Sequence, residues 1–260
     1  MSTWVAVSRG QHTSKYWKPR EAYSFSATEQ VAVVHVNELN LLLPHYCIAF
    51  IESNRVFVPV VILSLDAVKN LYVDTDGRWL GDYVPASLRA YPFSFAEGAD
   101  GNKILCVDNT QVSEDSSQRP FFNTDGSLTD DLNELMKFME SNRSAQEITA
   151  MACHALTEQN LIEPWLLTVS QGEASEPINL SGLFRINEQA LNQLDADKFA
   201  ELRKYGGLLL AYAQIFSTSQ LNQLTQRVRY HENKQEISNK DLTDMAGFFQ
   251  DSGALSFDNL

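Results

Sequence analysis

The apolar residues in the first 110 positions follow the short spacing of β-strands. Residues 31–36 hold four valines, residues 45–52 read HYCIAFIE, and residues 55–65 contain the unbroken apolar run VPVVIL. β-Branched residues favour strands, and an unbroken apolar run indicates a strand buried on both faces. Asp-Gly pairs at 76–77 and 100–101 each separate two short apolar segments, which predicts two further hairpins.

Beyond residue 118 the spacing of apolar residues becomes helical. Leu128, Leu132, Leu135 and Met139 recur at i, i+4, i+7 and i+11, so they fall on one helix face. The stripe resumes after a polar break at residues 141–144. We therefore expect one long helix, or two joined helices, over residues 128–160. Strands return within residues 163–186, and residues 187–229 again show helical spacing.

These elements predict an α+β fold. A mixed or antiparallel sheet from the N-terminal half would pack against helices from the C-terminal half. Because strands return after the long helix, we expect residues 1–230 to form a single domain. Residues 231–260 are polar and acidic and form a C-terminal extension. Within it, residues 238–250 keep apolar positions at helical spacing, which predicts a short helix that is either docked or a mobile motif.

Composition narrows the classes of function. The chain has 260 residues, of which 44% are hydrophobic and 20% charged, as in ordinary soluble domains. Its net charge of −13 argues against nucleic acid and anionic lipid as partners. No apolar run approaches the ~18 residues of a membrane span. Residues 1–20 lack the apolar core that a signal peptide needs. Together with three cysteines in apolar surroundings, this predicts a cytoplasmic protein without membrane insertion.

Candidate catalytic and metal-binding patterns are weak. His45 with Cys47, and Cys153 with His154, are the only close Cys/His pairs, and adjacent helical residues diverge too far for joint ligation. The chain has no Ser elbow, Gly-rich phosphate loop or helical His pair. We expect no metal and no cofactor. Enzymatic activity is not indicated, although a triad assembled only in the folded chain stays an alternative.

The densest candidate for recognition lies in residues 78–93. It contains the aromatic and basic side chains Arg78, Trp79, Tyr83, Arg89 and Tyr91. Trp, Tyr and Arg dominate the energetics of protein interfaces, so these five residues are the predicted binding residues. The alternative is that the aromatic rings belong to the core and that the arginines are solvated or pair with neighbouring aspartates.

The same region carries a family resemblance. Residues 70–79 (NLYVDTDGRW), followed by YVPA and LRAYPF, resemble the signature of the bacterial SapC family. The other matching segments are residues 46–50, 104–108, 161–164, 182–188 and 210–213. The resemblance extends over residues 31–224. It implies an accessory role, since members of the family tend to occur near genes for outer-membrane receptors and for flavin-dependent halogenase-like or cupin-like proteins. The family is named for an association with surface-layer systems and offers no catalytic residue to transfer.

Three functions are consistent with the sequence. The leading hypothesis is a cytoplasmic accessory protein that binds a protein or peptide partner through the aromatic-arginine segment. The second is an enzyme acting on a peptide or a surface-glycan precursor, with Arg78 or Arg89 meeting carboxylates such as Asp74, Asp82 or Asp108 in a deep pocket. The third is a self-assembling structural component that forms homo-oligomers through its C-terminal helix.

Overall fold

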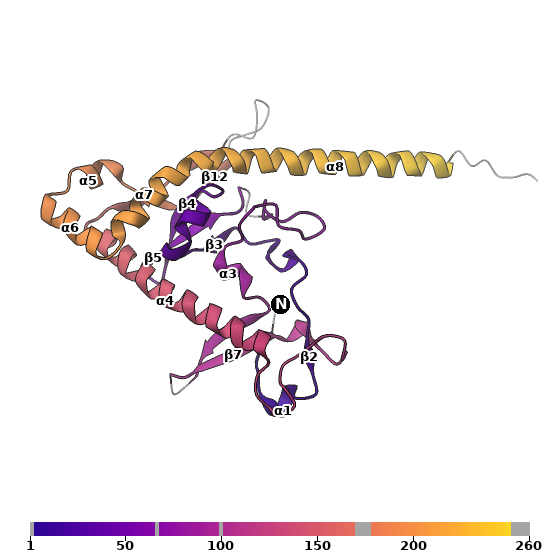
Figure 1. Ribbon diagram of the computed structural model, residues 1–260. Coiled ribbons are helices and arrows are strands. Elements are labelled where there is room, and N and C mark those ends of the chain that lie inside the picture. Colours follow the sequence, from indigo (N-terminus) through magenta and orange to yellow (C-terminus); the bar gives the residue numbers. More distant parts are fainter. Residues whose placement is uncertain (1–2, 66–67, 99–100, 170–177, 251–260) are drawn as a thin grey trace, which may run out of the picture.

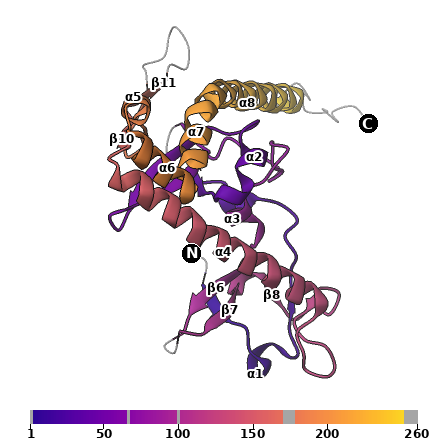
Figure 2. The same cartoon turned by 60° about the vertical axis from the view of Figure 1, so that its left-hand side comes forward.

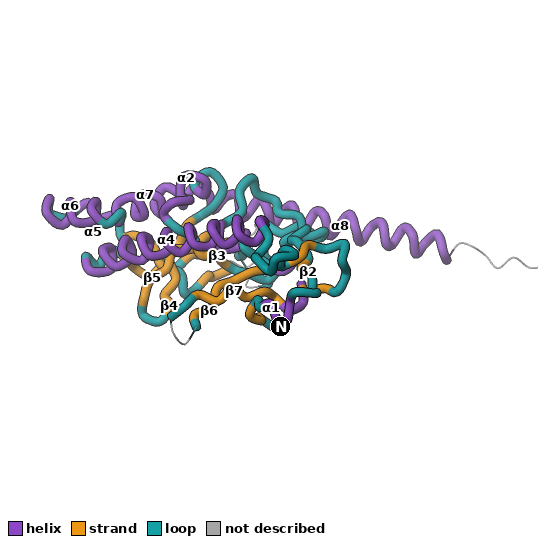
Figure 3. The backbone as a smooth tube through the Cα atoms, turned by 60° about the horizontal axis from the view of Figure 1, so that its bottom comes forward, coloured by secondary structure: helices purple, strands orange, loops and turns teal. Residues whose placement is uncertain are grey.

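The computed structural model describes residues 3–65, 68–98, 101–169 and 178–250. Its central sheet has five strands in the order β10-β13-β4-β5-β3, and every pairing in it is antiparallel. Helices lie over one side of the strands, as Figure 3 shows, and the α+β prediction is confirmed. The strands of this sheet are β3 (Val31–Val33), β4 (Ile48–Ser53), β5 (Val56–Ile62), β10 (Ile162–Pro164) and β13 (Phe184–Ile186).

The predicted strands at 45–52 and 55–65 form the hairpin β4–β5. Asn54 and Arg55 join them with φ of 51° and 65°, the left-handed pair that a two-residue turn requires. The β5 residues from Val60 to Ile62 are buried, as the unbroken apolar run predicted. The sequence therefore located the centre of this sheet correctly.

The other described strands form three smaller sheets. The predicted hairpin around Asp100-Gly101 is confirmed as β6–β7, and β1 pairs with the other edge of β7. The predicted hairpin around Gly77 is shorter than expected, because its strands share one bridge, between Val73 and Trp79. The remaining strands are β1 (Trp4–Ala6), β2 (Tyr16–Trp17), β6 (Phe93–Glu97), β7 (Lys103–Asp108), β8 (Val112–Ser113), β9 (Arg119–Pro120), β11 (Leu167–Val169) and β12 (Ile178–Leu180).

One long helix, α4 (Asp130–Glu158), resolves the two alternatives for residues 128–160 in favour of a single helix. Figures 1 and 2 show it crossing the molecule diagonally. Its neighbours are helical too, as the spacing beyond residue 187 predicted. The other helices are α1 (Arg9–His12), α2 (Leu39–Leu42), α3 (Ala86–Arg89), α5 (Glu188–Asn192), α6 (Ala196–Lys204), α7 (Gly207–Ser217) and α8 (Leu221–Gln250).

Helix α4 joins two hydrophobic cores. Its C-terminal half, with Cys153 and Leu156, packs in the larger core on the central sheet, which draws residues from Ala32 to Leu224. Its N-terminal half, with Leu132 and Met139, packs in a smaller core with the β6–β7 hairpin. The polar stretch predicted as a break lies between these two buried ends, where the helix is mostly exposed.

Gln214 of α7 fills a gap in the central sheet. Strands β13 and β4 pair only at Phe184 and Phe50. The next facing pair, Ile186 and Ile48, is bridged by the buried Gln214 side chain. Its Oε1 accepts from Ile186 N at 2.9 Å and its Nε2 donates to Ile48 O at 3.3 Å. A side-chain amide thus replaces a missing step of the ladder, because buried backbone groups need partners.

Buried Asp74 anchors α8 to the turn that precedes Trp79. Lys234 Nζ lies 2.6 Å from Asp74 Oδ1, and Tyr230 Oη donates to Asp74 Oδ2 at 3.2 Å. Burial alone raises the pKa of Asp74, but the hydrogen bonds from Lys234, the Thr75 amide and Tyr230 outweigh it and hold that pKa far below its usual range. Helix α8 continues without a break through residue 231, where the sequence predicted a boundary, and its far end extends past the other elements in Figure 1. The division at that boundary stays a prediction.

His231 of α8 is buried beside Asp74. Lys69 Nζ lies 2.9 Å from His231 Nδ1, and His231 Nε2 lies 3.1 Å from Leu71 O. An ammonium can only donate and a carbonyl can only accept, so Nδ1 must accept and Nε2 must carry the proton. Burial lowers the pKa of His231, and Lys69 and Lys234 lower it further, against opposing contributions from Leu71 O and Asp74. The folded chain therefore holds a neutral imidazole here.

Replacing Gln214 with Leu should lower the free energy of unfolding by about 2–4 kcal/mol, because two buried backbone groups each lose a partner. Urea unfolding followed by circular dichroism measures the change. The matched control is Gln189→Leu, which alters an exposed residue of α5. Equal stabilities of the two variants would contradict the bridging role of Gln214.

Stability should fall as the pH drops below about 6.5, the ordinary pKa of histidine. In the folded chain the pKa of His231 is lowered, and burial lowers those of His12 and His35 as well. Below that pH the unfolded chain binds more protons, so stability is complete above it and decreases toward acid. The contribution of Asp74 is lost only below the usual pKa of aspartate.

The test compares urea unfolding at about pH 7.5 and about pH 5.5 for the parent and for His231→Gln. We expect a smaller loss of stability on acidification in the variant. His154→Gln is the control, since the His154 side chain is 73% exposed. A pH dependence in His231→Gln equal to that of the parent would refute the assignment.

Candidate functional site

The structure places the five predicted binding residues in three different environments. Arg78 is exposed on the side that faces α8, where its Nη2 lies 3.4 Å from Asp74 Oδ2. Trp79 is buried in the larger core. Tyr83, Arg89 and Tyr91 are half-buried near α3. The fold therefore keeps these last three together and places Arg78 elsewhere.

Trp79 acts as a support. Its ring stacks on Tyr72 at a centroid distance of 5.7 Å, and its Nε1 donates to Tyr46 Oη at 2.9 Å and to Tyr83 O at 3.1 Å. Tyr46 Oη donates to the same carbonyl. These contacts fix the backbone at Tyr83, so Trp79 positions the residues that follow it.

A buried carboxylate holds Tyr83 in place. Glu38 is 3% exposed and accepts hydrogen bonds from His35 N at 3.1 Å, from Ala86 N at 2.9 Å and from Tyr83 Oη at 2.8 Å. Burial raises the pKa of the Tyr83 hydroxyl, and the hydrogen bond to Glu38 raises it further. Tyr83 therefore keeps its proton at neutral pH and is oriented toward Glu38.

Arg89 is placed by Tyr83 and by α4. Its Nη2 donates to Tyr83 Oη at 3.0 Å, and its guanidinium lies over the rings of Tyr83 and Phe138 at 5.2 and 4.8 Å. Cation–π contacts of this kind orient an arginine without neutralising it. Its Nε is buried and has no hydrogen-bond partner among the described residues.

Arg89 and Tyr91 line a pocket of about 460 Å³ between the smaller core and α4. Trp17 and Phe93 contribute aromatic surface, and α4 contributes the opposite wall. In Figure 2 the N-terminal half of α4 runs beside β6 and β7, and β6 begins with Phe93, which lines the pocket. The α4 residues that line the pocket are Asp131, Glu134, Leu135 and Phe138.

Two further arginines reach this pocket from distant parts of the chain. Arg20 Nη1 donates to Arg89 O at 2.5 Å and to Leu88 O at 3.4 Å, which ties residue 20 to the end of α3. Arg119 Nη1 lies 2.8 Å from Asp131 Oδ2. Within the described residues, neither Arg20 nor Arg89 forms an ion pair. The pocket therefore holds two arginines whose charge is not offset by a direct partner.

A smaller pocket of about 260 Å³ adjoins the first one and shares Pro19, Arg20 and Tyr91 with it. The Tyr91 ring stacks on Phe25 at 3.9 Å, and its Oη donates to Asp108 Oδ2 at 3.0 Å. Burial raises the pKa of Tyr91, and the bond to Asp108 adds to this effect. The Tyr91 side chain is thus held in one orientation and lines both pockets.

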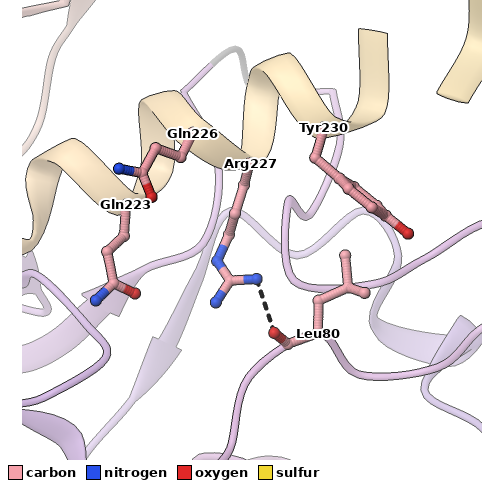
Figure 4. A pocket seen from close by; sticks show the side chains of 5 residues that line it. All are labelled: Leu80, Gln223, Gln226, Arg227 and Tyr230. Carbon is pink, nitrogen blue, oxygen red and sulfur yellow. Dashed lines mark hydrogen bonds between the residues drawn. The ribbon is translucent and has the colours of Figure 1, made fainter. Parts of the chain in front are cut away.

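A separate pocket of about 300 Å³ lies against α8 (Figure 4). Arg227 Nη1 donates to Leu80 O at 2.8 Å, and its guanidinium covers the Tyr72 ring at 4.1 Å. Gln223, Gln226 and Tyr230 complete the lining. None of the five predicted residues lines this pocket, so we place the candidate site at the other pocket.

The Cys/His pairs do not form a site. Cys47 and Cys153 are buried free thiols, and burial raises the pKa of each to about 12. The imidazoles of His45 and His154 lie 3.8 Å from Asp82 and Glu158, respectively. Within the residues that the structure describes, no three potential metal ligands are gathered.

Sequence reasoning missed Trp17, Arg20, Arg119 and Phe138. The segment WKPR at residues 17–20 has the same mixture of aromatic and basic residues as the predicted segment. That composition was a usable signal. The sequence could not show that this segment lies beside Arg89, because the two segments meet through tertiary contacts. These are the hydrogen bonds of Arg20 to the end of α3 and the edge-on contact of Trp17 with Phe93.

Comparison with known proteins gives one result. No curated protein and no solved structure matches this chain. Among the described residues, no helix has both the length and the apolar character needed to cross a bilayer. The model of the SapC family matches residues 7–224, which include every residue of the candidate pocket. The chain therefore belongs to the SapC family.

Proposed function

We propose that this protein is a non-catalytic accessory protein that recognises a protein or peptide partner through the pocket around Arg89 and Tyr91. The observation that carries the proposal is the convergence of Arg20 and Arg89 with Tyr91 in one hollow. Arginine and aromatic residues in a partly buried, preorganised pocket are the typical centre of a protein interface. Three buried free cysteines support a reducing compartment such as the cytoplasm.

The orientation of the side chains supports binding over catalysis. Tyr83 and Tyr91 each donate to a carboxylate, and their raised pKa values keep both hydroxyls protonated at neutral pH. Neither hydroxyl is therefore poised as a base. Arg78 meets Asp74 as the enzyme hypothesis expected, but Lys234 and Tyr230 of α8 occupy the same carboxylate, which makes this contact an anchor for a helix.

Two adjacent hollows support a peptide as the occupant. The larger and smaller pockets share Arg20 and Tyr91, so an extended segment of a partner could place one side chain in each. Arg20 and Arg89 are both half-buried, so neither side chain is fully enclosed by the chain itself.

Replacing Arg89 with Ala should weaken partner binding by about 30-fold or more, the loss expected for an interface hot spot. The tagged protein is used to capture a partner from its native lysate, and the purified partner is then titrated by calorimetry. Tyr91→Ala should also weaken binding. The control is Arg143→Ala, whose parent side chain pairs with Glu147 on the surface of α4 at 3.9 Å. Unchanged affinity in folded Arg89→Ala and Tyr91→Ala would refute the proposal.

A further inference from the structure

We infer that the pocket takes a carboxylate of the partner, held by Arg20 and Arg89, with the apolar group next to that carboxylate against Trp17 and Phe93. The inference rests on the proposed function, since it names the chemical group recognised at the same site. Three observations lead to it: the lack of a counter-ion for two arginines, the preorganisation of Arg89, and the small net charge of the lining.

The missing counter-ion is unexpected in this chain. Acidic residues outnumber Lys and Arg by 33 to 20, so a partly buried arginine has many carboxylates available. Nevertheless, within the described part of the chain neither Arg20 nor Arg89 forms an ion pair. Partly buried charges are usually paired. An anionic ligand would supply the partner that the chain itself does not.

Arg89 is held ready for such a ligand. The rings of Tyr83 and Phe138 flank its guanidinium, and only its Nη2 bonds to Tyr83. Its Nε remains buried without a partner among the described residues. A planar guanidinium presents its N–H groups as a fork that matches the two oxygens of a carboxylate. Because the side chain is already ordered, binding costs little conformational entropy.

The lining favours a single negative charge. Arg119 is paired with Asp131, and Glu134 on the same helix also lines the pocket. Three arginines against two carboxylates leave a net charge of one, which a monovalent carboxylate neutralises. A phosphate dianion would instead meet two acidic side chains on the α4 wall. The surrounding Trp17, Phe93 and Leu135 provide apolar contact for the group that bears the carboxylate.

The experiment compares two probes that differ only in charge, N-acetyl-phenylalanine and N-acetyl-phenylalaninamide. For probes of this size the dissociation constant is on the order of 1 mM, so ligand-observed NMR titration is suitable. In the parent the acid should bind about tenfold more tightly than the amide. Arg89→Gln and Arg20→Gln should each abolish this preference, whereas Arg143→Gln should keep it.

A short peptide that ends in a free phenylalanine carboxylate distinguishes the sources of this group. Tighter binding of the peptide than of the acetylated amino acid identifies a peptide C-terminus, which the adjoining hollow can extend. Equal affinity identifies a free small carboxylic acid. In both cases the carboxylate inference is supported.

Three results would overturn the inference. The first is equal affinity of acid and amide in the parent, and the second is tighter binding of inorganic phosphate than of the acid. The third is the absence of saturation by either probe up to about 10 mM. Equal binding of acid and amide that is lost in Phe138→Ala would leave the proposed function intact. Clear preference for the acid without any protein partner would instead remove the proposed function and keep the carboxylate site.

Discussion

The packing of α4 against two separate cores is the constraint on which the other features depend. The helix has 29 residues and is therefore roughly 43 Å long. Its two ends bury apolar side chains in different places, one on the central sheet and one on the β6–β7 hairpin. A rigid rod that joins both cores fixes the distance between them. The pocket forms where the N-terminal half of this rod passes the segment that carries Arg89.

Buried polar groups then determine how the remaining elements meet. Glu38 accepts from two backbone amides and one hydroxyl, Gln214 bridges two strands, and Asp74 receives Lys234 and Tyr230 of α8. Each of these groups would be costly to bury alone, so each is satisfied by several partners. Hydrogen bonds are directional, so these groups fix the relative positions of the elements that they join more closely than hydrophobic packing alone would. Buried Glu38 accepts a hydrogen bond from Tyr83, and Tyr83 accepts one from Arg89, so a buried group fixes the position of an arginine that lines the pocket.

The pocket is a positively charged region in an acidic chain. The chain is strongly acidic, and the arginines that converge here are drawn from residues 20, 89 and 119. One of them is paired with Asp131, while the other two are held by carbonyls and aromatic rings. Their guanidinium groups are therefore oriented, and no carboxylate in the described part of the chain pairs with them. This positive charge is the basis of the proposal that the pocket binds a negatively charged group of a partner.

Local interactions allowed the sequence alone to determine much of this protein. Apolar spacing located the β4–β5 hairpin, the β6–β7 hairpin and the helical stretch at residues 128–160, because strand and helix periods depend on near neighbours. The structure then showed that this stretch is one helix. The motif resemblance identified the family. Composition proposed five binding residues, and two of them, Arg89 and Tyr91, line the candidate pocket. Only the tertiary structure shows that Arg78 lies outside the pocket and that Trp79 is buried in the larger core. It also shows that Trp17, Arg20, Arg119 and Phe138 line the pocket. These residues are far apart in the chain. Helix and strand periodicity depends on near neighbours, so it cannot show which distant side chains the packing of two cores brings together.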